Sequence, residues 1–125
     1  MIRKLGLVEA GFPTAAEEEK DNFITLDELI INNRNASYLL TVKGDSMRDA
    51  GILDGDLIVI EKKENAKAGQ IVVASVDGEY TLKYLRLDKN KKYYLEAANP
   101  SYDNIYPKNE LQVQGVLIAV IRKYK

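Results

Sequence analysis

A tight-turn signal divides the stretch Ile71-Val72-Val73-Ala74-Ser75-Val76-Asp77-Gly78-Glu79-Tyr80-Thr81-Leu82-Lys83-Tyr84-Leu85 into two strand-like runs. Asp-Gly between such runs predicts a β-hairpin, because the tight turn needs residues that tolerate positive φ values. Similar runs rich in β-branched or aromatic residues occur at 38–42, 57–60, 80–86, 92–97 and 113–121. The sequence therefore predicts a mainly β fold, in which a mostly antiparallel sheet curls into a partly open barrel.

The N-terminal part of the chain has a different pattern. Residues 1–22 lack sustained periodicity and end in the charged run Glu17-Glu18-Glu19-Lys20-Asp21, which is typical of a mobile arm. Thr25-Leu26-Asp27-Glu28 then has the spacing of a capping box and predicts a short helix of about two turns ending near Asn32-Asn33. We expect an arm over residues 1–24 and a single folded domain over residues 25–125.

The composition excludes several classes of function. With no cysteine and no histidine, the chain has no disulfides or thiolate–metal sites, and no metal or other cofactor is expected. A net charge of −1 argues against direct sequence-specific DNA binding by the chain's own electrostatics. Lys89, Lys91 and Lys92 form a small basic cluster, interpreted as a solvated hairpin tip, with a local nucleic-acid contact as the alternative.

The hydropathy pattern gives an expectation about location. No apolar run reaches the roughly 20 residues that span a bilayer. Met1-Ile2-Arg3-Lys4 is not followed by the apolar core of a signal peptide. A cytoplasmic protein without a membrane anchor is therefore expected.

One serine and one lysine are the candidate catalytic residues. Ser46 follows an apolar strand in Val42-Lys43-Gly44-Asp45-Ser46-Met47, and a serine hydroxyl needs a base to become a nucleophile. Lys83 is the candidate base, because Thr81 and Leu85 share its face of the strand and an uncharged surrounding lowers a lysine pKa. The alternative from spacing alone is a turn serine and a solvent-facing lysine.

Four motifs in order carry a resemblance to the self-cleaving LexA/UmuD family of serine–lysine peptidases. They are Gly44-Asp45-Ser46-Met47, Gly51-Ile52-Leu53-Asp54-Gly55-Asp56-Leu57, Gly69-Gln70-Ile71-Val72-Val73-Ala74 and Asp77-Gly78-Glu79-Tyr80-Thr81-Leu82-Lys83. The resemblance covers residues 10–122 and implies that Ser46 is the nucleophile and Lys83 the general base. Backbone N–H groups around the nucleophile, from Asp45, Ser46 and Met47, are the candidates for an oxyanion hole.

The same resemblance implies a substrate within the chain. Family members cut their own chain at an Ala-Gly or Cys-Gly bond upstream of the serine, and Ala10-Gly11-Phe12-Pro13 looks like that site. The predicted scissile bond joins Ala10 to Gly11 and lies in the predicted arm. Enough chain separates Gly11 from Ser46 for cleavage either in cis or in a neighbouring subunit.

The position of the predicted cleavage site favours the UmuD type within this family. With only ten residues up to Ala10, we expect no helix-turn-helix DNA-binding domain before it. The resemblance then implies a homodimer whose cleavage is stimulated by a RecA filament on single-stranded DNA in the SOS response. Removal of the arm lets the homodimer activate an error-prone (Y-family) translesion DNA polymerase. The arm is short for this type, and alanine stands where some members have cysteine.

Several alternatives remain open at this point. The chain could be a Ser/Lys peptidase that acts in trans on another protein, or a non-catalytic polymerase-binding module. Asp54 and Asp56 are interpreted as turn residues, with paired catalytic carboxylates as the alternative. Asn99-Pro100-Ser101-Tyr102 predicts a loop of undetermined role, although in the resembled family this region lies close to the cleavage-site cleft.

Overall fold

The computed structural model describes residues 1–4, 6–8, 10 and 23–124. The chain divides into two compact units, Met1–Asn32 and Asn33–Lys125. The boundary between residues 24 and 25 that we expect from the sequence stays a prediction.

The first unit contains a short strand pair and a helix. Strand β1 (Ile2–Arg3) pairs antiparallel with β2 (Phe23–Ile24), a pairing too short to leave a periodic pattern in the sequence. Helix α1 (Leu26–Ile30) begins after Thr25, whose hydroxyl accepts a hydrogen bond from the Glu28 N–H at 3.1 Å, as the capping box predicts. The helix is shorter than the expected two turns, because Ile31 already has extended backbone angles.

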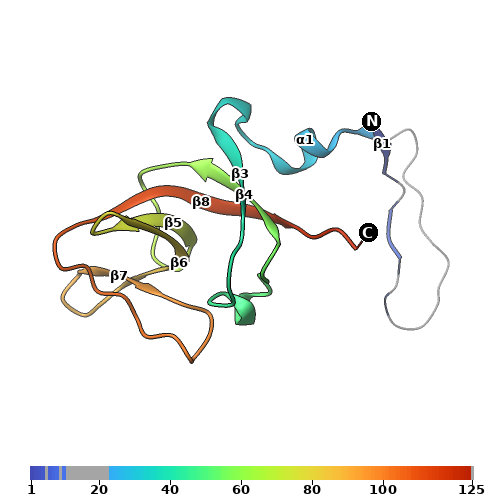
Figure 1. The fold of residues 1–125 in the computed structure, drawn as a ribbon. Helices are drawn as coiled ribbons and strands as arrows, with labels where there is room; N and C mark the ends of the chain where they lie inside the picture. Colours follow the sequence, from blue (N-terminus) through green and yellow to red (C-terminus); the bar gives the residue numbers. More distant parts are fainter. Residues whose placement is uncertain (5, 9, 11–22, 125) are drawn as a thin grey trace. The chain divides into compact units, whose positions relative to one another are not determined.

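The second unit is built on one antiparallel sheet of six strands. Their order across the sheet is β3, β4, β8, β5, β6 and β7 (Figure 1). The strands are β3 (Ser37–Thr41), β4 (Leu57–Lys62), β5 (Ile71–Val76), β6 (Glu79–Leu87), β7 (Tyr93–Glu96) and β8 (Leu111–Ile121). The six predicted strands are all present, each within two residues of its expected ends, which confirms the mainly β fold. In the described residues β3 and β7 are edges, so the sheet stays open.

Short turns connect these strands. Two 3₁₀ helices, η1 (Arg34–Ala36) and η2 (Arg48–Ala50), flank β3. The β5–β6 hairpin turns at Asp77 and Gly78, which have φ values of 49° and 89°, as the Asp-Gly signal predicts. The basic cluster forms the β6–β7 turn, where the Asp88 N–H donates to the Lys92 carbonyl at 2.9 Å, so its interpretation as a hairpin tip is confirmed.

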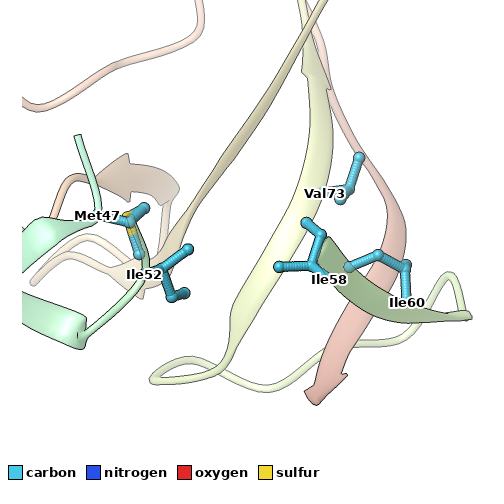
Figure 2. Packing of buried hydrophobic residues seen from close by; sticks show 5 residues of the cluster. All are labelled: Met47, Ile52, Ile58, Ile60 and Val73. Atoms are coloured by element: carbon cyan, nitrogen blue, oxygen red, sulfur yellow. The ribbon is translucent and has the colours of Figure 1, made fainter. Parts of the chain in front are cut away.

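Strand β5 is buried on both faces. Val73 belongs to a cluster with Met47, Ile52, Ile58 and Ile60 (Figure 2). On the other face of β5, the core cluster is Val72, Ala74, Leu85, Leu95 and Val116. Successive residues of a strand point to opposite faces, so the continuous apolar run of β5 fills both clusters. Because Met47 belongs to the first cluster, the segment that follows Ser46 is anchored in the core.

No helix among the described residues is long and apolar enough to cross a membrane.

Candidate active site

Ser46 lies in a turn that is fixed on both sides. Before it, the Gly44 N–H donates to the Asp54 carboxylate at 2.7 Å, and Gly44 has a φ of 91° that favours glycine. After it, the Met47 side chain is buried in the core. Asp54 lies in the turn before β4, as the sequence predicts, and its side chain also stabilises the turn that carries Ser46. The hydroxyl of Ser46 is held between a hydrogen-bonded loop and a packed side chain.

Lys83 reaches this turn from β6. Its side chain is buried, with 7% of the residue exposed. The Nζ atom lies 3.0 Å from Ser46 Oγ, 2.7 Å from Thr81 Oγ1 and 3.2 Å from the Leu82 carbonyl oxygen. All three partners are uncharged, and burial lowers the pKa of the Lys83 ammonium below its ordinary value of 10.5. The structure thus brings the two predicted catalytic side chains into contact.

All three partners of Nζ can accept a hydrogen bond from the ammonium, and they also allow a neutral amine. A neutral lysine has two N–H donors and one lone pair, whereas the ammonium has three donors. The Leu82 carbonyl can only accept, and Thr81 Oγ1 can also accept, so these two atoms use both N–H groups. The lone pair is then left for the Ser46 hydroxyl proton, at a distance within the range for proton transfer between a base and a nucleophile.

The serine–lysine pair opens into a cleft of about 270 Å³. Besides Ser46 and Lys83, its lining includes the apolar residues Leu40, Val42, Met47, Ile58, Val73 and Leu82. The apolar part of this lining suits a small apolar side chain. A larger cavity of about 680 Å³, lined by Leu85, Tyr93 and residues of β8, contains neither residue of the pair.

The backbone N–H groups of Asp45, Ser46 and Met47 belong to the nucleophile and its two neighbours in the chain. None of the described residues accepts a hydrogen bond from these three groups. They remain available to an oxygen atom of a substrate, as an oxyanion hole requires. Their role as donors to an oxyanion stays a prediction.

The loop between β7 and β8, to which the sequence assigns no role, also contributes to the site. Asn99 Nδ2 donates to the Asp45 carbonyl at 2.9 Å, and Tyr102 Oη donates to Asp45 Oδ1 at 2.6 Å. The Asp49 N–H donates to the Ala98 carbonyl at 2.7 Å. These partners are far apart in the chain, so no local pattern could have revealed the contact.

The predicted cleavage site belongs to the first compact unit. Ala10 is exposed, whereas Gly11 lies outside the described residues. The geometry of the predicted scissile bond is therefore not described, and its assignment stays a prediction.

In the described ranges, no group of three or more aspartate, glutamate, histidine or cysteine side chains is placed to hold a metal ion.

Comparison with known families identifies the family of this chain. Residues 4–118 match the model of the family described as Peptidase S24-like, and the chain belongs to this family. Relatives include LexA repressor 2 of Xanthomonas axonopodis pv. citri, which is 39% identical over 120 residues. The LexA repressor of Alcanivorax borkumensis is 41% identical over 119 residues. The alignments cover 94% of this chain but 55% and 57% of these relatives, so the chain spans just over half of their length.

Proposed function

We propose that the chain is a self-cleaving serine peptidase in which Ser46 is the nucleophile and Lys83 the general base. One observation carries this proposal: a buried lysine amine with only uncharged hydrogen-bond partners lies 3.0 Å from a serine hydroxyl. Burial is the usual way to make lysine a base near neutral pH, because it disfavours the ammonium form. Membership of the Peptidase S24-like family supports the same reaction.

The first half-reaction breaks the Ala10–Gly11 bond. Neutral Lys83 takes the proton of the Ser46 hydroxyl as Oγ attacks the Ala10 carbonyl carbon. Backbone N–H groups of Asp45, Ser46 and Met47 stabilise the tetrahedral oxyanion, and loss of one such donor costs about 10²–10³-fold in rate in other enzymes. The intermediate collapses to an ester on Ser46, and the Lys83 ammonium gives its proton to the leaving Gly11 nitrogen.

The second half-reaction releases the arm. Lys83, neutral again, takes a proton from a water molecule that attacks the ester carbonyl. The second tetrahedral intermediate collapses, Lys83 returns the proton to Ser46 Oγ, and the Ala10 carboxylic acid leaves and loses its proton to solvent. The products are residues 1–10 and a chain that begins at Gly11.

The wider role of the reaction rests on the resemblance to the UmuD type. In this proposal, a RecA filament on single-stranded DNA stimulates cleavage in the SOS response. The cleaved cytoplasmic homodimer then regulates error-prone translesion synthesis by a Y-family DNA polymerase. The names of the relatives favour a second candidate, a self-cleaving part of a LexA-type repressor.

Intact-mass spectrometry tests the reaction itself. The wild-type (unchanged) chain is incubated at pH 7 and pH 10, with and without RecA, single-stranded DNA and a non-hydrolysable ATP analogue. We expect loss of residues 1–10, faster at pH 10 and with RecA, and no loss in Ser46→Ala or Lys83→Ala. Matched controls are Ser37→Ala, an alternative serine, and Lys43→Ala, an exposed lysine that lines the same cleft.

The same experiment separates the alternatives. A rate that does not depend on protein concentration indicates cleavage in cis, and a rate proportional to concentration indicates cleavage between subunits. If the unchanged chain stays intact but cuts an added Ala-Gly peptide, it is a peptidase that acts in trans. If it does neither under any condition, the peptidase proposal is wrong and a non-catalytic binding module becomes the better hypothesis.

The two wider roles differ in what the cleaved chain does. For the translesion role, the cleaved form increases primer extension past a DNA lesion by a purified Y-family polymerase, and the Ser46→Ala form does not. For the repressor role, the cleaved form leaves extension unchanged, and cleavage instead ends operator binding by the DNA-binding protein that contains this chain.

A further inference from the structure

Asn99 is a buried polar residue whose amide has a fixed orientation. It is 4% exposed. Its Oδ1 atom accepts from the Ser101 N–H at 3.0 Å and from Arg48 Nη2 at 3.4 Å. Both of these partners are donors, so the carbonyl side of the amide must face them. The NH₂ side therefore faces the Asp45 carbonyl oxygen, 2.9 Å away.

The Asp45 carbonyl and the Ser46 N–H belong to one peptide unit. This unit is planar and trans, because the structure has no cis peptide bonds, so its C=O and N–H point in opposite directions. A hydrogen bond that holds the Asp45 carbonyl therefore also sets the direction of the Ser46 N–H. Rotation of this peptide would break the bond from Asn99 Nδ2 and leave a buried amide without its acceptor.

The loop that carries Asn99 is itself attached to the nucleophile turn at further points. Tyr102 Oη holds the Asp45 carboxylate at 2.6 Å, and the Asp49 N–H donates to the Ala98 carbonyl at 2.7 Å. These contacts lie on both sides of Ser46 in the sequence. The β7–β8 loop thus restrains the turn before and after the nucleophile.

We propose that Asn99 is a positioning residue that orients the Asp45–Ser46 peptide, so that the Ser46 N–H donates to the tetrahedral oxyanion. This inference rests on the proposed peptidase function, and it adds a residue 54 positions from Asp45 to the machinery of that function. Asn99 does not touch the reacting atoms and acts through the peptide unit that it holds. Loss of the Asn99 N–H donor should weaken oxyanion stabilisation, whereas the hydrogen-bond partners of Lys83 should stay the same.

The test uses two substitutions and two readouts. Asn99→Asp has nearly the same shape but an ionised carboxylate that cannot donate to the Asp45 carbonyl, and Asn99→Ala removes the donor without adding charge. We expect the limiting self-cleavage rate at high pH to fall about 10²-fold in both. The midpoint of the pH–rate profile should be the same in Asn99→Ala as in the wild-type chain.

The second readout is labelling of Ser46 by a fluorophosphonate, which forms a tetrahedral adduct without the arm. We expect labelling to slow by about the same factor as self-cleavage, since both need the oxyanion hole. Asn104→Asp is the matched control, because Asn104 lies in the same loop and its Nδ2 contacts Tyr106 Oη at 3.4 Å. Both rates should be unchanged in this control.

The outcomes separate the inference from the proposed function. If folded Asn99 variants cleave themselves and are labelled at Ser46 as fast as the wild-type chain, the inference about Asn99 is wrong, but the peptidase function is not affected. If the wild-type chain neither cleaves itself nor is labelled at Ser46, the peptidase function itself is contradicted. If neither Asn99 variant folds, the inference is tested by nuclear magnetic resonance of the wild-type chain, through the chemical shift of the Ser46 amide proton. The Ser46 amide proton should move downfield on adduct formation, and an unmoved resonance overturns the inference.

Discussion

The Lys83 amine and the Ser46 hydroxyl lie 3.0 Å apart, although 37 residues separate them in the chain. The core explains this proximity. Lys83 pairs with Val72 on β5, and the next residue of β5, Val73, packs in the same cluster as Met47, the neighbour of Ser46 (Figure 2). The distance between base and nucleophile is therefore set by packed side chains and a hydrogen-bonded strand pair.

The first prediction concerns the pH dependence of self-cleavage. Only neutral Lys83 can accept the serine proton, and burial lowers its pKa below 10.5. The rate should rise with pH through this lowered pKa and reach a plateau below pH 10.5. Intact-mass spectrometry from pH 6 to pH 11 measures the profile. Lys83→Arg, which keeps the charge but cannot lose its proton, should be inactive at every pH.

A pH–rate profile with its midpoint at pH 10.5 would contradict this prediction, because Lys83 would then titrate with its ordinary pKa.

The second prediction concerns Thr81, whose Oγ1 atom accepts from Lys83 Nζ at 2.7 Å. Thr81→Val keeps the shape but removes this acceptor. A typical hydrogen bond contributes about 1 kcal/mol, so the limiting cleavage rate should fall about fivefold. The ammonium form gains more from an acceptor than the neutral amine, so the midpoint of the pH–rate profile should also move to lower pH.

The matched control is Thr41→Val, because Thr41 lines the same cleft and is exposed. Its profile should superimpose on that of the unchanged chain. A Thr81→Val midpoint that moves to higher pH would show that Thr81 does not act through Lys83.

The sequence was sufficient to predict the strands and the pair of catalytic candidates. The β5–β6 hairpin follows from local chemistry, since Asp77-Gly78 tolerates the two positive φ values of the turn. Helix α1 is shorter than the sequence predicts. The capping box marks its start, but the extended backbone at Ile31 ends the helix, and no helix-breaking residue at this point indicates the end in the sequence.

Contacts between distant segments leave no local pattern in the sequence and cannot be predicted from it. The sequence identifies Asn99 and Tyr102 only as loop residues, and their hydrogen bonds to Asp45 depend on how the β7–β8 loop returns to the nucleophile turn. The sequence indicates that Asp56 is a turn residue, but it is also buried and accepts hydrogen bonds from Arg122. Such pairs arise from the assembled sheet, and single-sequence patterns carry no information about them.

The third prediction concerns Gly115, which lies in β8 where this strand meets β4. A Cβ atom at this position would collide with Ile60 Cγ2 and approach the Glu61 carbonyl oxygen to 2.9 Å. Gly115→Ala should therefore lower the free energy of unfolding by about 1–3 kcal/mol, the usual cost of overpacking a core. Urea denaturation measures this change. Gln112→Ala, at an exposed position on the same strand, should stay within about 0.5 kcal/mol.

A Gly115→Ala chain as stable as the original would mean that β4 and β8 can separate slightly without loss of packing. The strand pair would then be less rigid than the contacts of Ile60 indicate.

The fourth prediction concerns acid unfolding and the pair Asp56–Arg122. Arg122 Nε and Nη2 each donate to the buried Asp56 carboxylate at 2.7 Å, and the Leu53 N–H donates at 2.8 Å. The hydrogen bonds from Arg122, followed by that from Leu53, lower the pKa of Asp56 from 3.8 to about 2. The folded state therefore holds this proton less tightly than the unfolded state.

The sign of the pH dependence follows from this difference. The stabilisation by Asp56 is fully present above pH 3.8, and it is lost as the pH falls through about 2. Urea denaturation at several pH values between 5 and 2 should show the free energy of unfolding falling over this interval. Arg122→Gln should be less stable at pH 5 and should show a shallower fall, because the folded-state pKa of Asp56 returns toward its ordinary value.

Arg86→Gln, which removes a half-exposed ion pair with Glu96, is the control and should keep the original slope. An equal slope in Arg122→Gln would mean that other carboxylates dominate acid unfolding, and that Arg122 fixes the end of β8 without setting the titration of Asp56.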